Sequence, residues 1–223
     1  MLRHIIRLYV LVIAISWAAG PARSASIPIE NASFEAPAVD PNGFGAEPNV
    51  DGWTEIDNAP LGDSVNTGVF LNTPPDSPDH IVNADGSQLA FLGSEQGNAL
   101  EQDLAATYKV GCDYRLTVAV GVSMLLPPSA EVPADTLELV LYYRDGNEPV
   151  DIVSRTVTAM PWSQLLQDFF VYLPKVQSGD TCAGKTIGVV IRATGTSGGF
   201  WDLDNVRLVE SLLGPPLALT VEE

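Results

Sequence analysis

The sequence predicts an all-β fold, an antiparallel β-sandwich or jelly roll. Short apolar segments recur along most of the chain, and turn residues such as Asp145-Gly146-Asn147 separate them. Tyr114–Val120 alternates large apolar residues with polar or small ones, which is typical of a half-buried strand. No long helical period supplies the helices that a parallel sheet needs. We therefore expect eight strands: Leu89–Leu92, Ala99–Leu104, Tyr114–Val120, Thr136–Tyr143, Val150–Thr158, Leu166–Leu173, Thr186–Ala193 and Phe200–Val209.

Two stretches depart from this pattern and are expected to be long loops. Asp40–Asn83 is rich in Gly, Pro, Asp and Asn, with short apolar islands at Trp53 and Val69–Leu71, and Ser123–Asp135 contains three prolines. Loops of this length in a compact domain are usually functional or flexible. We expect them to cap one end or one face of the sandwich.

The first 24 residues have the features of a secretory signal peptide. A basic start is followed by the apolar run Leu8–Ala19 and by small residues near Ala22. This run is too short for a comfortable membrane span, and no later run is long enough for an anchor. The sequence thus predicts a signal peptide at 1–24, a single sandwich domain at 25–210, a tail at 211–223, and a secreted or periplasmic location.

The charge of the chain excludes several classes of partner. Without the leader, 8 basic residues remain against 28 acidic ones, a net charge of about −20. Such a surface repels nucleic acid and anionic lipid but attracts divalent cations. We expect no nucleic-acid or membrane partner, and the state of association, including a homo-oligomer, stays open.

Few residues offer nucleophilic or zinc chemistry. Beyond the leader His80 is the only histidine, and it lies in a Pro/Asp-rich loop where a solvated side chain is expected. A Ser-His-Asp triad or a histidine-rich metal site therefore lacks its residues. Cys112 and Cys182 lie near strand ends, and export would permit a disulfide between them, although sequence alone leaves the bridge open.

The last predicted strand carries two acids in an apolar setting. Alternation places Asp202 and Asp204 on one face with Val206 and Leu208, which predicts that both carboxylates point toward the core. A buried ionised carboxylate is costly unless a cation or another partner compensates it, and carboxylate oxygens suit calcium. The alternative is a strand that frays after Leu203 and leaves both acids in solvent.

A second acid near the start of the chain offers a partner for this strand. In Asn31-Ala32-Ser33-Phe34-Glu35, Phe34 is expected in the core and Glu35 follows it directly. First and last strands of a sandwich often lie side by side, so Glu35 and Asp204 are candidate ligands of one structural Ca²⁺. The alternative is that Glu35 is an ordinary solvated acid.

These segments carry a resemblance to known families. Asn31–Glu35, Gly52-Trp53 and Asp202-Leu203-Asp204-Asn205-Val206-Arg207-Leu208 resemble carbohydrate-binding modules with the galactose-binding-like jelly roll, in which an N-terminal glutamate and a C-terminal aspartate share a structural calcium. Over nearly the whole chain after the leader, the opening Ser26–Asn31 and the same ending are more similar to the Stig cyclases. Those calcium-binding sandwiches rearrange and cyclise isoprenylated indoles, with an aspartic acid as proton donor in an aromatic pocket.

The resemblance implies roles for individual residues. Asp202 would be the proton donor and Asp204 the calcium ligand, because a carboxylate on calcium stays ionised whereas a general acid needs a raised pKa; the reverse order stays open. Tyr142 is grouped with Asp202 as a catalytic candidate. Four further aromatic residues are candidates to bind the substrate, the alternative for each being plain core or surface: Trp53, Phe70, Phe91 and Tyr143.

Three functions compete at this point. The resemblance favours a secreted, calcium-binding cyclase that acts on a small hydrophobic isoprenoid-indole-type molecule. A carbohydrate-binding module would instead stack sugars on exposed Trp53 or Trp162. An extracellular interaction protein would use calcium for stability only.

Overall fold

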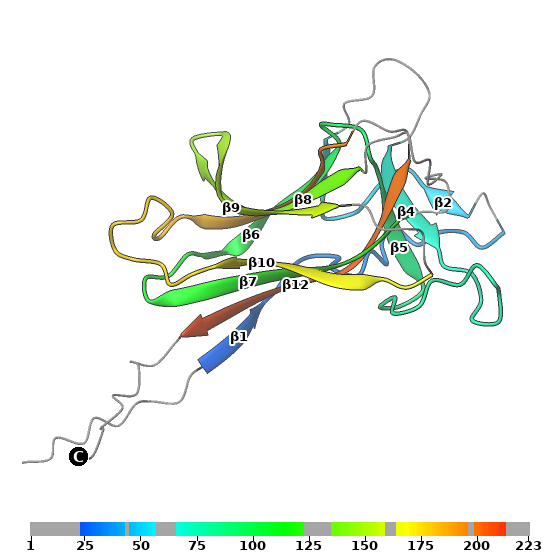
Figure 1. The fold of residues 1–223 in the computed structure, drawn as a ribbon, viewed down its shortest axis with the longest axis horizontal. Helices are drawn as coiled ribbons and strands as arrows, with labels where there is room; N and C mark the ends of the chain where they lie inside the picture. The colour runs from blue at the N-terminus through cyan, green and yellow to red at the C-terminus, as the bar shows by residue number, and fades with distance from the viewer. Residues whose placement is uncertain are drawn as a thin grey trace, which may run out of the picture.

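The computed structural model describes residues 23–42, 45–56, 66–122, 135–158, 164–195 and 199–212. These residues form two antiparallel sheets and contain no helix, which confirms the predicted sandwich. The two sheets face each other as layers in Figure 1. No helix in the described part of the chain has the length and apolar character needed to cross a membrane.

The larger sheet has seven strands. Its order is β10-β7-β12-β5-β4-β2, and β1 pairs with the C-terminal half of β12, so the first and last described segments lie side by side (Figure 1). The strands are β1 (Arg23–Ile27), β2 (Ala46–Glu47), β4 (Thr67–Leu71), β5 (Gln88–Gly93), β7 (Cys112–Val122), β10 (Gln167–Leu173) and β12 (Phe200–Leu212).

The smaller sheet has five strands in the order β3-β6-β11-β8-β9. All eight predicted strands are present in the two sheets, most of them slightly longer than predicted. The five members of this sheet are β3 (Thr54–Ile56), β6 (Ala99–Thr107), β8 (Thr136–Asp145), β9 (Glu148–Thr158) and β11 (Thr186–Ala193).

The stretch Asp40–Asn83 is not simply a loop, as the sequence had suggested. It contains β2, β3 and β4, which are two to five residues long and pair with neighbouring strands. Strands this short show too little alternation to be found among glycines and prolines. Most of the second expected loop, Ser123–Asp135, lies outside the described residues, as do the leader up to residue 22, Trp162 and the tail from residue 213.

The core lies between the two sheets and is built from alternate residues of each strand. Leu116, Val118 and Val120 of β7 are fully buried there, opposite Leu139 and Leu141 of β8. Burial of this apolar surface is the main driving force for folding. Phe34 is also fully buried in this core, as predicted, with its ring centroid 5.6 Å from that of Trp53.

A β-bulge in β12 reverses which residues face the core. The pairing of β12 with β7 shifts register between Asp204 and Arg207, and Asn205 takes a positive φ of 48°. Before the bulge, Trp201 and Leu203 join the core; after it, Val206 and Leu208 do. The prediction that the two aspartates share a face with Val206 and Leu208 is therefore wrong.

Candidate active site on the outer face of the larger sheet

Asp202 lies on the outer face of the seven-stranded sheet, away from the core between the sheets. Its strand partners are Gly121 on β7 and Phe91 on β5, and directly opposed residues in a sheet point to the same face. Phe91 is in turn opposite Gly68 on β4. A row of four residues therefore crosses the sheet in the order Gly121, Asp202, Phe91, Gly68.

A small apolar cluster adjoins this row on the side of Asp204, whose partner on β7 is Ala119. It consists of Leu89, Ala119 and Leu166, with Phe70, Ile81 and Ala84 packed against it. Leu166 is placed by a short backbone ladder, because Val82 N donates to Gln164 O (2.6 Å) and Leu166 N donates to Val82 O (3.1 Å). Two separate segments, 81–84 and 164–166, thus cover this end of the outer face.

The loop that supplies Ile81 is held by its own polar contacts. Asn72 and Ile81 are joined by two hydrogen bonds, of 2.8 and 2.9 Å. His80 is half-buried, and its Nδ1 lies 2.5 Å from Thr73 O, so its ring is engaged in the loop and does not reach Asp202. His80 therefore fixes the loop that borders the site.

Two aromatic residues neighbour Asp202 on the outer face of the sheet. Phe91 and Phe200 are both half-buried, and their ring centroids are 5.7 Å apart in an edge-to-face arrangement. Phe200 is two residues before Asp202 on the same strand and hence on the same face. The negative faces of such rings can stabilise a cation that develops beside the acid.

The carboxyl of Asp202 is poised to hold a proton near neutral pH. Its residue is 8% exposed, and no described residue donates a hydrogen bond to the carboxyl. Burial away from water disfavours the ionised form and raises the pKa of Asp202 to about 7. A carboxylic acid with this pKa is suited to general acid catalysis.

Asp204, two residues further along β12, has different surroundings. It is fully buried, its Oδ2 accepts a hydrogen bond from Asp85 N (2.5 Å) and its Oδ1 accepts one from Asn205 N (2.6 Å). Burial raises its pKa to about 7; the two amides oppose this rise, whereas the charges of Asp85 and Glu35 add to it. The carboxyl of Asp204 therefore has amide donors and acidic groups near it, whereas burial alone shifts the pKa of Asp202.

Glu35 reaches the same turn of the chain as Asp204. Its Oε1 accepts hydrogen bonds from Ser87 N (2.8 Å) and Gln88 N (2.7 Å), directly after Asp85. The backbone supports this approach, since Val206 N donates to Ala32 O (2.8 Å). The structure thus brings Glu35 and Asp204 to neighbouring residues of one turn, where the Glu35 residue is exposed and Asp204 is buried.

The carboxylates of Asp204, Glu35 and Asp85 are oxygen donors of the kind that a divalent cation binds. Asp204 is buried beside two other acids, and a hard divalent ion with oxygen ligands would compensate that charge. Within the described ranges, however, no group of three or more His, Cys, Asp or Glu side chains stands close enough to hold a metal ion by itself. A cation here would need backbone carbonyls or water to complete its ligands.

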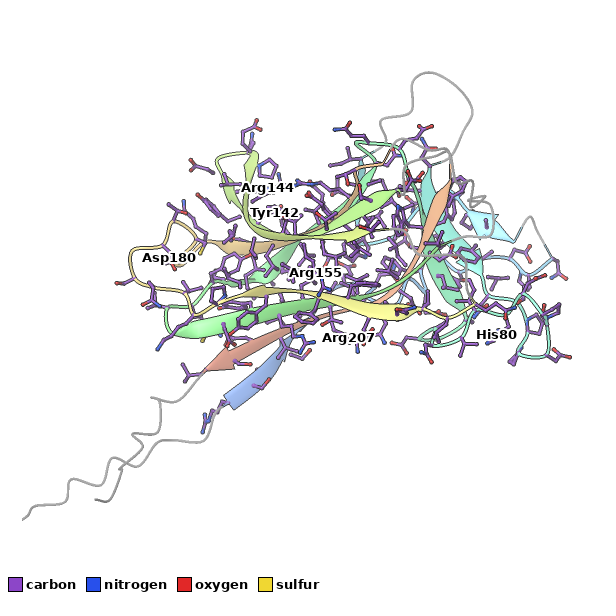
Figure 2. The ribbon with its side chains drawn as sticks, viewed as in Figure 1. His80, Tyr142, Arg144, Arg155, Asp180 and Arg207 are labelled. Carbon is purple, nitrogen blue, oxygen red and sulfur yellow. The ribbon has the colours of Figure 1, made fainter. Side chains whose placement is uncertain are left out.

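Tyr142 and Tyr143 are not brought to Asp202. Tyr142 lies on the outer face of the five-stranded sheet, where its ring covers Gly188 and its hydroxyl donates to Asp103 Oδ1 (2.8 Å). Figure 2 shows Tyr142 and Arg144 on that sheet, opposite the layer that carries Arg207. Tyr143 points into the core between the sheets. Alternation alone cannot tell which sheet a strand will join.

Ion pairs surround Tyr142 on the outer face of the five-stranded sheet. Arg144 contacts Glu101 Oε1 and Asp103 Oδ2, each at 2.7 Å. Burial, followed by the hydrogen bond to Asp103, raises the pKa of Tyr142 above its ordinary range. The tyrosine is therefore a neutral, fully buried donor in a polar network, far from the aromatic cluster around Asp202.

Trp53 and the two cysteines occupy structural positions. Trp53 is buried against Phe34, and its Nε1 donates to Asn31 O (3.3 Å), so it offers no exposed platform for a sugar ring. Cys112 and Cys182 are both buried in the core and are free thiols in the structure, without the disulfide that export would permit.

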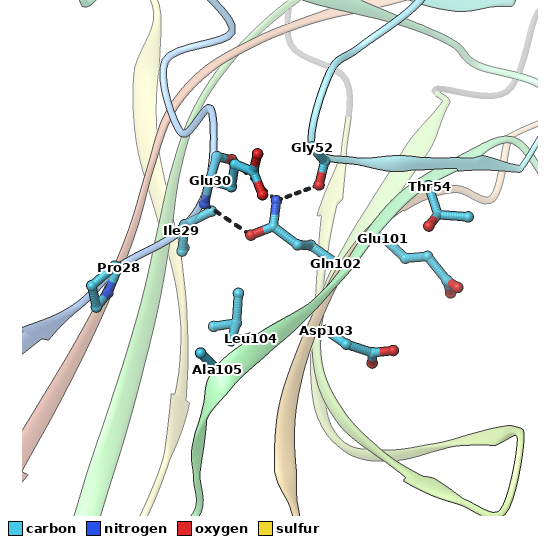
Figure 3. Close-up of a pocket in the computed structure, with 10 residues that line it drawn as sticks. All are labelled: Pro28, Ile29, Glu30, Gly52, Thr54, Glu101, Gln102, Asp103, Leu104 and Ala105. Atoms are coloured by element: carbon cyan, nitrogen blue, oxygen red, sulfur yellow. Dashed lines mark hydrogen bonds between the residues drawn. The ribbon is translucent and has the colours of Figure 1, made fainter.

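A separate groove of about 560 Å³ lies at the edge of the five-stranded sheet (Figure 3). Gln102 crosses it, accepting from Glu30 N (2.9 Å) and donating to Gly52 O (2.8 Å). Glu101 and Asp103 add two more acids, and none of the lining residues is aromatic. This groove is polar and lacks stacking surfaces, unlike the surroundings of Asp202.

The fold and the site together define a β-sandwich that carries a protonatable acid among aromatic side chains. A family model described as HpiC1 cyclase matches residues 25–209, and the chain belongs to this HpiC1-like cyclase family. No curated relative matches the chain.

Several solved structures are similar to this chain in fold. A cyclase from Fischerella sp. TAU has a TM-score of 0.66 and 22% identity, covering 86% of this chain and 100% of that one. A Stig cyclase from Fischerella sp. TAU in complex with (3Z)-3-(1-methyl-2-pyrrolidinylidene)-3H-indole has a TM-score of 0.66 and 23% identity, covering 84% and 98%. A third structure, with 22% identity, a TM-score of 0.66 and coverage of 86% and 100%, is a cyclase from the same organism in complex with 4-(1H-indol-3-yl)butan-2-one.

Sequence reasoning found part of this site and missed part. Phe70 and Phe91 lie on the outer face of the sheet with Asp202, and Phe91 is its strand partner. Phe200 was missed, although its position two residues before Asp202 could have indicated it. Leu166 gave no signal, since its place depends on the pairing with Val82.

Proposed function

We propose that this protein is an acid-promoted cyclase or isomerase of a small hydrophobic, isoprenoid-indole-type molecule, with Asp202 as the proton donor. The observation that carries the proposal is the Asp202 carboxyl itself. It is buried among apolar and aromatic side chains, free of hydrogen bonds from described residues, and has a pKa raised to about 7. Membership of a cyclase family and the indole ligands bound by similar structures are consistent with this substrate class.

The reaction consumes no proton overall, because Asp202 donates one proton and later takes one back. Protonated Asp202 gives its proton to an unsaturated carbon of the substrate, which leaves a carbocation and the Asp202 carboxylate. A double bond of the same molecule attacks the cation and closes a ring, and loss of a proton to the carboxylate restores the acid. Phe91 and Phe200 lie where they can stabilise the cation through their ring faces.

Exchange of the acid for its amide tests the role of Asp202. Asp202→Asn keeps the shape of the side chain but has no acidic proton, so turnover of a prenylated indole should fall by at least about 100-fold, in the range attributed to general acid catalysis. Binding of 4-(1H-indol-3-yl)butan-2-one, followed by calorimetry, should change by less than about threefold. Asp168→Asn, at an exposed position of the same sheet face, is the matched control. Full turnover by the Asp202 variant would refute the proposal.

We also propose that Glu35 and Asp204 hold a structural Ca²⁺. What supports this is their approach to the same turn and the rise in the pKa of Asp204, which burial causes and the charges of Asp85 and Glu35 increase. When bound, the ion supplies positive charge that keeps both carboxylates ionised and ties the two ends of the chain together. Asp202 would remain outside the metal site and free to carry a proton.

Chelation tests the calcium proposal. A ligand that binds only the native state at 100 times its dissociation constant stabilises it by about 2.7 kcal/mol. The melting temperature should therefore rise by several degrees between EDTA and millimolar Ca²⁺, and Glu35→Gln should abolish the rise. Glu148→Gln, on the exposed end of β9, should leave it intact. An equal melting temperature in EDTA and Ca²⁺ would count against the site.

The leader at 1–24 supports a further proposal, that the protein is exported and works outside the cytoplasm. N-terminal sequencing of the protein recovered from the periplasm or medium tests it. An intact N-terminus on a cytoplasmic product would contradict it.

A further inference from the structure

The row that contains Asp202 ends in a glycine on each side, Gly121 and Gly68, and each glycine lies beneath a large apolar side chain. A Cβ atom placed on Gly68 would lie 2.6 Å from Phe91 Cζ and 2.7 Å from Cε1, so the Phe91 ring lies across Gly68. A Cβ atom on Gly121 would lie 2.9 Å from Leu166 Cδ2. Neither side chain could keep its position if these glycines had a side chain.

The two contacts place the covering side chains differently with respect to the acid. Because the Phe91 ring extends toward β4, it leans away from β12 and leaves the β5 side of Asp202 uncovered by the ring. Leu166 lies on the other side, over Gly121, whose Cβ position would be 3.5 Å from Asp202 Cβ. Leu166 is 3% exposed, whereas Phe91 and Phe200 are half-buried.

We propose that Gly68 and Gly121 determine substrate size, because they set the positions of Phe91 and Leu166 on either side of Asp202. This inference rests on the proposed function and adds the residues that select among hydrophobic substrates. The aromatic part of the substrate contacts the exposed surface of Phe91 and Phe200. Its isoprenoid part takes the space limited by Leu166, a side chain with two rotatable bonds that can move at low cost.

The two sides of the site therefore respond differently to mutation. Truncation of Leu166 enlarges the aliphatic side and favours a longer isoprenoid chain. A methyl group on Gly68 pushes the Phe91 ring toward β12 and blocks the approach to the acid. Replacement of Phe91 by a smaller residue in the same protein removes that obstruction.

Binding of two probes of different size tests the inference without reliance on turnover. The smaller probe is 4-(1H-indol-3-yl)butan-2-one, and the larger one is an indole with a ten-carbon isoprenoid at C3. Calorimetry should show that Leu166→Ala improves the affinity ratio of larger to smaller probe at least fivefold. Gly68→Ala should weaken both probes at least tenfold, and Phe91→Leu added to it should restore them to within threefold of wild type. Gly179→Ala, at an open turn position, should change nothing.

Folding is checked separately, because a Cβ on Gly68 would also meet the Glu47 carbonyl oxygen of β2. If Gly68→Ala fails to fold by circular dichroism, Phe91→Ala alone carries this part of the test; it should weaken both probes at least threefold and leave their affinity ratio unchanged, because both probes contact the Phe91 ring through their indole. A wild-type affinity ratio in Leu166→Ala, together with wild-type affinities in Gly68→Ala or in Phe91→Ala, would overturn the inference and leave the role of Asp202 untouched. A wild-type protein that binds neither probe would overturn the substrate class and the inference together.

Discussion

Asp202→Asn is expected to change how the stability of the protein depends on pH. The pKa of Asp202 is raised from 3.8 to about 7 in the folded protein, so the folded state holds its proton more tightly than the unfolded state. The stability that this provides is complete below about pH 4 and is lost as pH rises through 7. The asparagine variant has no such loss.

The size of the effect follows from the shift in pKa. A shift of this size corresponds to about 4 kcal/mol at 1.36 kcal/mol per pKa unit, and about 2.5 kcal/mol of it is lost between pH 5 and pH 8. The free energy of unfolding of Asp202→Asn should therefore gain about 2.5 kcal/mol relative to wild type over that interval. For a domain of this length the gain corresponds to roughly 5–10 °C in melting temperature.

Urea unfolding at pH 5, 6.5 and 8, followed by tryptophan fluorescence, measures this difference. Asp204 titrates in both proteins, so its contribution cancels in the comparison, and the series is run in EDTA and again in Ca²⁺. Asp76→Asn, on an exposed loop, is the control and should run parallel to wild type. Parallel curves for wild type and Asp202→Asn would refute the claim that the acid is buried and protonated, and with it the basis of the proposed mechanism.

Three further experiments test the fold. Asn205→Gly should leave the free energy of unfolding within a few tenths of a kcal/mol of wild type and Asn205→Val should lower it by about 1–3 kcal/mol, because only the glycine accepts the positive φ of the bulge; equal unfolding midpoints would contradict this. Gly188→Ala should cost about 1–3 kcal/mol by overpacking against the Tyr142 ring, whereas Gly188→Ala with Tyr142→Leu should recover part of the loss; chemical denaturation is the measurement. Cys112 and Cys182 should react with a thiol reagent only after unfolding, two per chain, and a protein without reactive thiols in denaturant would show a disulfide instead.

The structural features that the sequence predicts correctly depend on residues close together in the chain or on the pairing of its two ends. Strands such as Tyr114–Val120 were found because alternation and flanking turns lie within a few residues of each other. The approach of Glu35 to Asp204 was also predictable, since it required only that the first and last segments be neighbours. Tyr142 was misplaced relative to Asp202 because sheet membership depends on pairings between distant strands.

The error about β12 has a different origin. Asn205 looks like an ordinary strand residue, and a single bulge there inverts the face of every residue on one side of it. The two aspartates were correctly placed on one face, but that face is the outer one. Leu166 could not be found at all, because it reaches the site through a backbone pairing with a loop more than 80 residues away.

The bulge keeps the acids of β12 on the outer face while residues on both sides of it pack in the core. Trp201, Leu203, Val206 and Leu208 are constrained by the core, whereas the outward side chains of Asp202 and Phe200 can be exchanged without opening a hole between the sheets. Substitutions at these outward positions could thus change the chemistry of the site without disturbing the core. Deletion of one residue at Asn205 would remove this separation, forcing either the acids inward or Val206 and Leu208 out into water.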